Sequence, residues 1–99
     1  MKWIETTDPN QLGAIAAAGE LPDFDPESPM RHCADAHWTL VSQNVPIARC
    51  SLWWRKAPFL PGQRLGLIGH YAATELIAGR EVLRHACQQL ADKGCTLAV

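Results

Sequence analysis

One stretch of this chain combines groups suited to binding an anion and to moving a proton. In residues 70–80, HYAATELIAGR, a histidine near the end of an apolar run precedes an amphipathic segment with helical spacing. A strand that leads into a helix N-terminus is a common phosphate-binding geometry, because the first helical amides lack partners and the helix dipole favours an anion. Residues 70–80 are therefore the candidate binding site, and Gly79 is its one glycine.

Two features of this stretch each allow two interpretations. His70 follows the apolar run, where an imidazole has a suitable pKa for accepting a proton from an amine, although a histidine there can also simply close a strand. The turn is either a phosphate loop before a helix that starts near Gly79, or part of a helix that begins earlier with Thr74 as its N-cap. In the second case one face of the helix carries Leu76, Gly79, Leu83, Cys87 and Leu90, and the small residues only permit close packing.

Other groups of reactive type carry less specific patterns. His32, Cys33 and His37 are metal-ligand types, but they lack a paired spacing and a fourth ligand, so the sequence predicts no metal. The four cysteines, Cys33, Cys50, Cys87 and Cys95, lie singly and without a nucleophile motif. We expect them to be buried thiols in a reducing compartment, and Trp38, Trp53 and Trp54 to be core or interface anchors.

Length and charge limit the classes of function. A chain of 99 residues forms one domain, residues 1–99, and its net charge of −1 comes with no basic stripe that would indicate a nucleic-acid partner. No run of roughly 18 apolar residues indicates a membrane span, and the N-terminus does not resemble a signal peptide. The sequence predicts a cytoplasmic protein.

The first third of the chain is expected to provide one strand and one helix. Residues 1–7 read as a strand, and Asp8 followed by Pro9 is a typical helix start. The helix is predicted over 9–18 with Gly19 as its stop. Residues 20–36, rich in proline and acids, are predicted to be a long loop or an irregular turn of helix.

The remainder is expected to form a hairpin, a strand, a helix and a final strand. The predicted ranges are 37–41 and 47–55 for the hairpin, 64–73 for the next strand, 79–93 for the helix and 96–99 for the last strand. Trp53 and Trp54 are adjacent and must point to opposite faces, which suggests a central strand covered on both sides. The last strand is apolar in the style of a parallel strand reached by a right-handed crossover. The helical spacing indicates a buried face of Val82, Leu83, Ala86, Cys87, Leu90 and Ala91.

These elements give an α/β (α+β) fold with a mixed sheet in the order β-α-β-β-β-α-β. The segments HWTLVSQNVPIARCSLWW, RLGLIGHYAA, GREVLRHACQQLADKGC and TLAV resemble, in this order, the first two-thirds of a GNAT-type N-acetyltransferase. The helix from Gly79 to Gly94 is the most specific match in length, apolar register and closing glycine. The resemblance implies a GNAT-like domain that is truncated relative to a full one.

The resemblance implies that acetyl-CoA or CoA lies along the fourth strand and at the start of the following helix. The positions that match are Leu67, Ile68, Gly69, His70, Ala78, Gly79 and Arg80. The family's pyrophosphate loop, Gln/Arg-x-x-Gly-x-Gly/Ala, falls on residues 74–79, where only Gly79 matches. Ile77 replaces a glycine, Glu75 adds a negative charge that Arg80 partly offsets, and the loop is degenerate.

The family's domain continues beyond the matched part through further strands and a helix that usually carry catalytic groups. The resemblance therefore implies an acyl-CoA-binding type of domain that lacks acetyltransferase activity by itself, with a missing C-terminal part or a homo-oligomeric partner. The alternative is a non-enzymatic assembly module that dimerises through its exposed sheet edge. Neither function involves nucleic acid or a membrane.

Overall fold

A five-stranded sheet organises the chain, and the computed structural model describes all of residues 1–99. The strands lie in the order β1-β2-β3-β4-β5, with antiparallel pairs from β1 to β4 and a parallel pair between β4 and β5. The strands are β1 (Lys2–Glu5), β2 (Ala36–Ser42), β3 (Val45–Trp53), β4 (Leu65–Ala73) and β5 (Leu97–Ala98). The helices are α1 (Pro9–Ala16), α2 (Ser28–Arg31) and α3 (Leu76–Asp92).

The mixed α+β fold predicted from the sequence is confirmed, with one addition. Residues 20–36, predicted as a long loop or an irregular turn of helix, contain the single helical turn α2. Asp8 caps α1 as predicted, because its side chain accepts a hydrogen bond from the amide of Asn10 at 3.0 Å and Pro9 is the first helical residue. The helix ends at Ala16, two residues earlier than predicted.

The turn between β2 and β3 is shorter than the predicted link. β2 ends at Ser42 and β3 begins at Val45, so only Gln43 and Asn44 connect them, and both have positive φ angles of 52° and 65°. Two such residues form the tight hairpin turn whose twist matches that of the flanking strands. The hairpin therefore starts pairing at its tip, with Ser42 opposite Val45.

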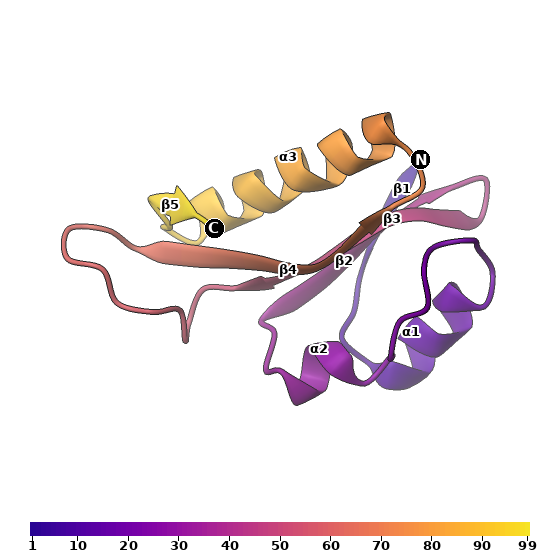
Figure 1. Ribbon diagram of the computed structural model, residues 1–99, viewed down its shortest axis with the longest axis horizontal. Helices are drawn as coiled ribbons and strands as arrows, with labels where there is room; N and C mark the ends of the chain where they lie inside the picture. Colours follow the sequence, from indigo (N-terminus) through magenta and orange to yellow (C-terminus); the bar gives the residue numbers. More distant parts are fainter.

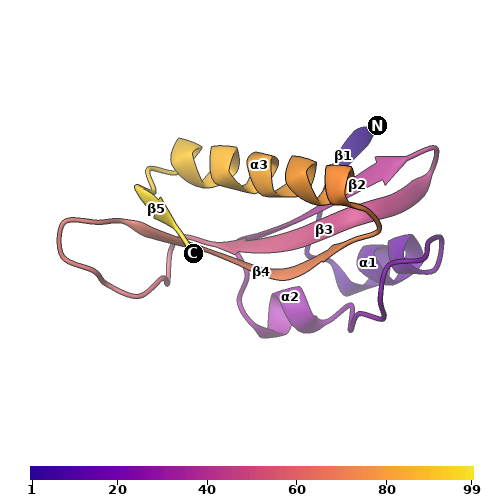
Figure 2. The ribbon, with the colours of Figure 1, turned by 45° about the horizontal axis from the view of Figure 1, so that its top comes forward.

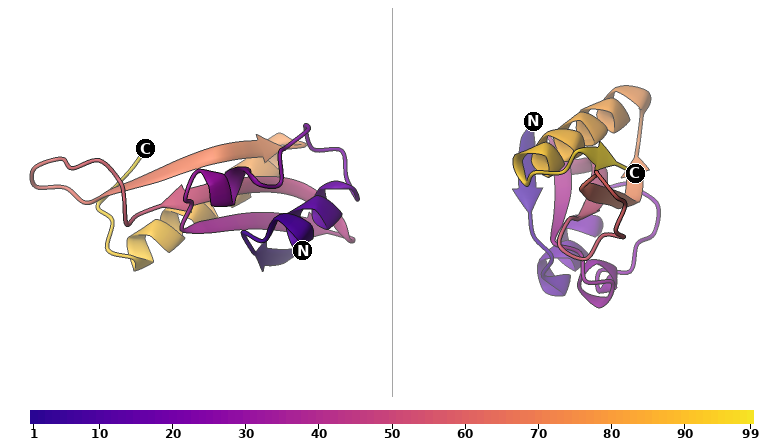
Figure 3. Two further views of the ribbon diagram at one scale, coloured as in Figure 1. Left: turned by 90° about the horizontal axis from the view of Figure 1, so that it is seen from below. Right: turned by 90° about the vertical axis from the view of Figure 1, so that its left-hand side faces the viewer.

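Helices cover both faces of the sheet. α3 lies along one face, and α1 and α2 lie against the other (Figures 1 and 2). The view from below shows α1 and α2 in front of the strands, and the connection between β3 and β4 extends beyond the sheet (Figure 3). The two tryptophans of β3 take opposite faces as predicted, since Trp53 contacts His70 on the α1–α2 side and Trp54 packs against the α3-side core. No helix has both the length and the apolar character that crossing a membrane requires.

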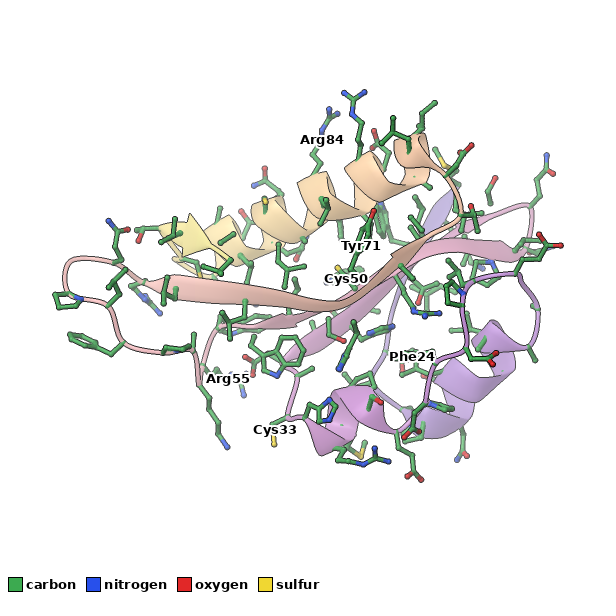
Figure 4. All side chains as sticks on the ribbon, in the orientation of Figure 1. Phe24, Cys33, Cys50, Arg55, Tyr71 and Arg84 are labelled. Atoms are coloured by element: carbon green, nitrogen blue, oxygen red, sulfur yellow. The ribbon has the colours of Figure 1, made fainter.

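The apolar core lies between the sheet and α3. From α3 it includes the fully buried Val82, Ala86 and Leu90, which pack on Leu40, Ala48, Cys50 and Leu52 of the sheet. In Figure 4, Cys50 and Tyr71 lie on this side of the sheet. Residues four positions apart return to one helix face, so Val82, Ala86 and Leu90 form the centre of the buried stripe.

Several positions predicted to be buried are exposed. Leu83, Cys87 and Ala91 each follow a stripe residue by one position, and a rotation of about 100° carries them toward solvent. The cysteine prediction was therefore right only for Cys50: Cys95 is half-buried, and Cys33 and Cys87 are exposed.

Candidate functional site

The sheet face that lies under α1 and α2 carries a row of buried polar side chains. His37 of β2 lies directly opposite Ser51 of β3, and Thr39 lies opposite Arg49 two residues further along. These four are the buried polar or charged residues of the chain. The residues between them, including Leu40, Cys50 and Leu52, point to the apolar α3 side, so the sheet has one apolar and one polar buried face.

A bulge in β4 brings His70 into this row. Ser51 pairs with Gly69 and Arg49 pairs with Ala72, so His70 and Tyr71 together oppose the single residue Cys50. His70 has a φ of 52°, in the left-handed region that a side-chain-bearing residue enters only at a special position. The bulge keeps the His70 side chain on the same face as Gly69, whereas regular alternation would turn it toward α3.

Three histidines and one serine form a continuous hydrogen-bonded series, which we call the histidine chain. Ser51 Oγ lies 2.7 Å from His37 Nδ1 and 2.8 Å from His70 Nδ1. The other ring nitrogen of His70, Nε2, lies 2.9 Å from Nδ1 of His32, the residue that follows α2. His37 is almost fully buried and His32 is exposed, so the chain leads from the interior to the surface.

Aromatic side chains enclose the histidine chain. The Phe24 ring lies 5.3 Å from the His37 ring and 5.7 Å from the His70 ring, measured between centroids. Figure 4 shows Phe24 between the sheet and the α1–α2 layer. Trp53 donates from its indole Nε1 to the carbonyl of His32 at 2.8 Å and packs edge-on against His70. This enclosure excludes water from His37 and leaves His70 half-buried.

The enclosure lowers the pKa values of His37 and His70. Burial, with smaller effects from His70 and Arg49, lowers the pKa of His37 to about 4. Burial also lowers the pKa of His70, with His32 and Arg49 acting in the same direction. Around neutral pH, His37 is therefore a neutral imidazole that can both donate and accept hydrogen bonds.

The helix that follows β4 begins earlier than a phosphate loop ending at Gly79 would allow. α3 starts at Leu76, and the Gly79 amide donates to the carbonyl of Glu75 at 3.0 Å within the helix. The early helix start is the second interpretation given by the sequence, but Thr74 is not its cap. Thr74 instead donates from its amide to the carbonyl of Ile47, and Glu75 occupies the N-cap position without a side-chain hydrogen bond.

The β4 residues matched to the family's CoA-binding strand lie where the pairing between β4 and β5 ends. β5 pairs with β4 at Leu65 and Gly66, and the amide of Ile68 donates to the carbonyl of Val99. Leu67 and Gly69 pair with β3, and the Trp53 ring covers Gly69 so closely that an added Cβ would lie 2.9 Å from it. Beyond Ile68, β4 runs on to the start of α3 without β5 alongside it (Figure 2).

The structure separates the sequence-predicted site into two places. Leu67, Ile68, Gly69 and His70 lie along β4, whereas Ala78, Gly79 and Arg80 lie in the first turns of α3. Of the residues noted as metal-ligand types, His32 is hydrogen-bonded directly to His70 and His37 is linked to it through Ser51, while Cys33 stays exposed. No group of three or more His, Cys, Asp or Glu side chains is arranged to hold a metal ion.

Sequence reasoning missed Ser51, Arg49 and Phe24. The first two alternate with apolar residues along β3, and His37 and Thr39 do so along β2, so a period of two signals a polar face. Phe24 lies in the proline-rich segment between α1 and α2, where periodicity carries no information.

Comparisons with known proteins agree with this architecture. The chain matches no model of a protein family and no curated protein. The solved structure of a GCN5-related N-acetyltransferase from Ralstonia eutropha JMP134 superposes with a TM-score of 0.63 and 18% sequence identity, over 99% of this chain and 80% of that chain. The protein therefore has a GNAT-like fold.

Proposed function

We propose that this chain is an acyl-CoA-binding domain, with CoA or acetyl-CoA lying along Leu67 to His70 and its pyrophosphate at the first turn of α3. The observation that carries the proposal is the uncapped N-terminus of a 17-residue helix immediately after the part of β4 that β5 does not cover. Unpaired amides at such a terminus favour an anion. The GNAT-like fold supports the same placement.

The amides proposed to hold the pyrophosphate are those of Leu76, Ile77 and Ala78. They belong to the first helical turn, whereas the Gly79 amide is already paired with Glu75. Arg80, one turn into the helix and exposed, adds a positive charge beside the phosphates, and Glu75 opposes binding. Gly79 has a packing role, because it lies against the hydroxyl of Tyr71.

Calorimetric titration with CoA tests this proposal. We expect measurable heat and a thermal shift at millimolar CoA, with tighter binding in Glu75→Gln and weaker binding in Arg80→Gln, each by about threefold to tenfold for one exposed charge near a phosphate. Arg84→Gln is the matched control, since Arg84 is an exposed arginine further along the same helix. The absence of both heat and thermal shift at millimolar CoA would refute the proposal.

We further propose that the chain alone does not transfer an acetyl group. His70 is the residue placed to accept a proton from an amine, but Ser51 and His32 engage both of its ring nitrogens. A general base needs a free nitrogen within hydrogen-bond reach of the amine. Release of the CoA thiol from acetyl-CoA in the presence of small primary amines should proceed at the rate seen without protein. A faster release that changes when Ser51 or His32 is substituted would contradict this.

A second function, assembly with another copy of the chain, is favoured by the apolar edge at β5. Leu97 and Val99 are 43% and 66% exposed, and β5 is the last strand of the sheet. Light scattering should then report a dimer that Leu97→Lys dissociates and that Phe59→Lys, an exposed position on the β3–β4 connection, leaves intact. A monomer for the unmodified protein would count against assembly.

A further inference from the structure

Two hydrogen bonds join the C-terminal end of α2 to the sheet, and both involve His32. The Nδ1 atom of His32 lies 2.9 Å from Nε2 of His70 on β4. The carbonyl of His32 accepts a hydrogen bond from the indole of Trp53 on β3 at 2.8 Å. The two imidazole rings have centroids 5.1 Å apart. One residue therefore links α2 to two neighbouring strands.

The rest of α2 contributes little to this attachment. The helix is a single turn, and Pro29 is its one buried residue. Arg31, its last residue, pairs with Asp25 at 2.8 Å and with Glu27 at 3.3 Å, so its charge is matched within its own segment and not by the sheet. The hydrogen bonds of His32 are therefore a large part of what holds α2 against the strands.

The hydrogen bond between the two imidazoles depends on their protonation. When both rings are neutral, one proton lies between Nδ1 of His32 and Nε2 of His70. When one ring is charged, that proton remains and the bond becomes charge-assisted and stronger. When both rings are imidazolium ions, the two facing nitrogens are both donors, so the bond is lost and two positive charges oppose each other.

The groups that face His70 from other elements oppose this doubly charged state at neutral pH. Burial lowers the pKa of His70 below its usual 6.5, and His32 and Arg49 of β3 act in the same direction. His37 of β2, joined to His70 through Ser51, has a pKa of about 4 and is neutral there. The second proton therefore binds to the pair in acid.

The charged and titratable groups near His32 come from its own segment. They are the paired Asp25, Glu27 and Arg31, together with the exposed thiol of Cys33. Because the acids already share the guanidinium of Arg31, they are not free to pair with an imidazolium in place of the lost bond.

We propose that His32 and His70 form an acid-sensitive latch, which holds α2 on the sheet while at least one ring is neutral and releases it when both are charged. Opening takes up one proton, so its equilibrium constant should rise by up to about tenfold for each pH unit below the transition. Release uncovers His70 and Trp53, while α3 and its core stay in place. The latch lies on the opposite face of the sheet from α3, so it does not depend on CoA binding.

Solvent exchange of the Trp53 indole N–H, followed by NMR on the full chain, tests the latch. His32→Gln is the informative variant, because a glutamine carbonyl accepts from Nε2 of His70 whether that ring is neutral or charged. At about pH 5 the indole N–H should exchange about tenfold faster in the unmodified protein than in His32→Gln, and at about pH 7.5 the two rates should match. Equal rates at both pH values would overturn the proposal.

Two further measurements keep the test independent of that variant's folding. His85→Gln is the matched control, since His85 stacks on Trp3 on the α3 side, and it should exchange like the unmodified protein. In the unmodified protein, the acceleration should follow the titration of the His70 ring while the amide resonances of α3 stay in place. An acceleration that follows only His37, or that coincides with loss of all native resonances, would overturn the latch.

Discussion

Ser51 provides a hydrogen-bond partner for both His37 and His70. Its hydroxyl joins His37 and His70, and it is itself fully buried. Replacing it by alanine removes one partner from each imidazole without giving the buried His37 nitrogen any other. A buried polar group left without a partner costs about 1–3 kcal/mol.

We therefore expect Ser51→Ala to lower the free energy of unfolding by about 1–3 kcal/mol in urea titrations. Ser42→Ala is the matched control, because Ser42 is a half-buried serine at the end of β2, outside the histidine chain. It should change stability by less than about 0.5 kcal/mol. Equal effects of the two substitutions would contradict the structural role assigned to Ser51.

His37 makes stability depend on pH in a defined direction. Its pKa is lowered to about 4 in the folded chain, below the usual 6.5, so the unfolded chain binds the proton more readily. Its contribution is complete above about pH 6.5 and is lost as the pH falls toward 4. From this group alone, the free energy of unfolding should be about 2 kcal/mol lower at about pH 5 than at about pH 7.5.

Urea midpoints measured across this range check the prediction against His37→Gln. The variant should show a smaller slope of unfolding free energy against pH. The slope that remains comes from His70 and His85, whose pKa values burial also lowers. An unchanged slope in the variant would show that His37 is not the titrating group.

At the scale of elements, α3 and the bulge of β4 meet at Gly79. A Cβ at Gly79 would overlap the hydroxyl of Tyr71, which the bulge directs toward α3, whereas the ring carbon Cζ at 3.5 Å would be in ordinary contact. The hydroxyl is thus the atom that excludes a side chain at this position. Gly79 is otherwise a costly choice in a helix, because alanine is preferred there by about 1 kcal/mol.

A double-mutant cycle in thermal or urea unfolding separates these two effects. Gly79→Ala should destabilise the unmodified protein by about 1 kcal/mol, and in the Tyr71→Phe background the same change should stabilise it by up to about 1 kcal/mol. The same sign and size in both backgrounds would show that the tyrosine hydroxyl is not what requires glycine.

Most elements were predictable from the sequence, and the site was only partly so. Helix and strand periods predicted α1, the hairpin, β4 and α3, because each buries residues at regular spacing. β5 was predicted from its apolar composition as a buried parallel strand; it pairs in parallel with β4, but its residues are exposed. The position of His70 could not be derived, since one extra residue in β4 reverses the face of everything after it. Of the two starts that the sequence allowed for α3, the structure has the early one, at Leu76, with Glu75 and not Thr74 at the N-cap position. Periodicity could not decide between them, because Leu76 and Ile77 are apolar residues that remain exposed.

At the scale of the whole molecule, the two helical layers are held with unequal strength. α3 buries Ala78, Gly79, Val82, Ala86 and Leu90, while α1 buries only Leu12 and α2 only Pro29. The face under α1 and α2 is polar, so their separation from the sheet exposes little apolar surface. Local opening follows buried apolar contact, and these helices should open before the rest.

Native-state hydrogen exchange should therefore show two levels of protection. Amides of β2, β3 and α3 should exchange near the global free energy of unfolding, and those of α1 and α2 at values about 2 kcal/mol or more lower. A single level throughout would mean that the polar face holds its helices as firmly as the apolar one holds α3.

The histidine chain also has a direction. Ser51 has one hydroxyl proton, so when every group is satisfied its oxygen donates to one imidazole and accepts from the other, and His70 and His32 must then follow the same order. With all three imidazoles neutral, two tautomeric arrangements result, one with all donors pointing from His37 toward His32 and one with all of them reversed. Changing a single ring's tautomer would break the series, so the protons must rearrange together. Segments 38 residues apart in the sequence, His32 and His70, thereby share one binary state.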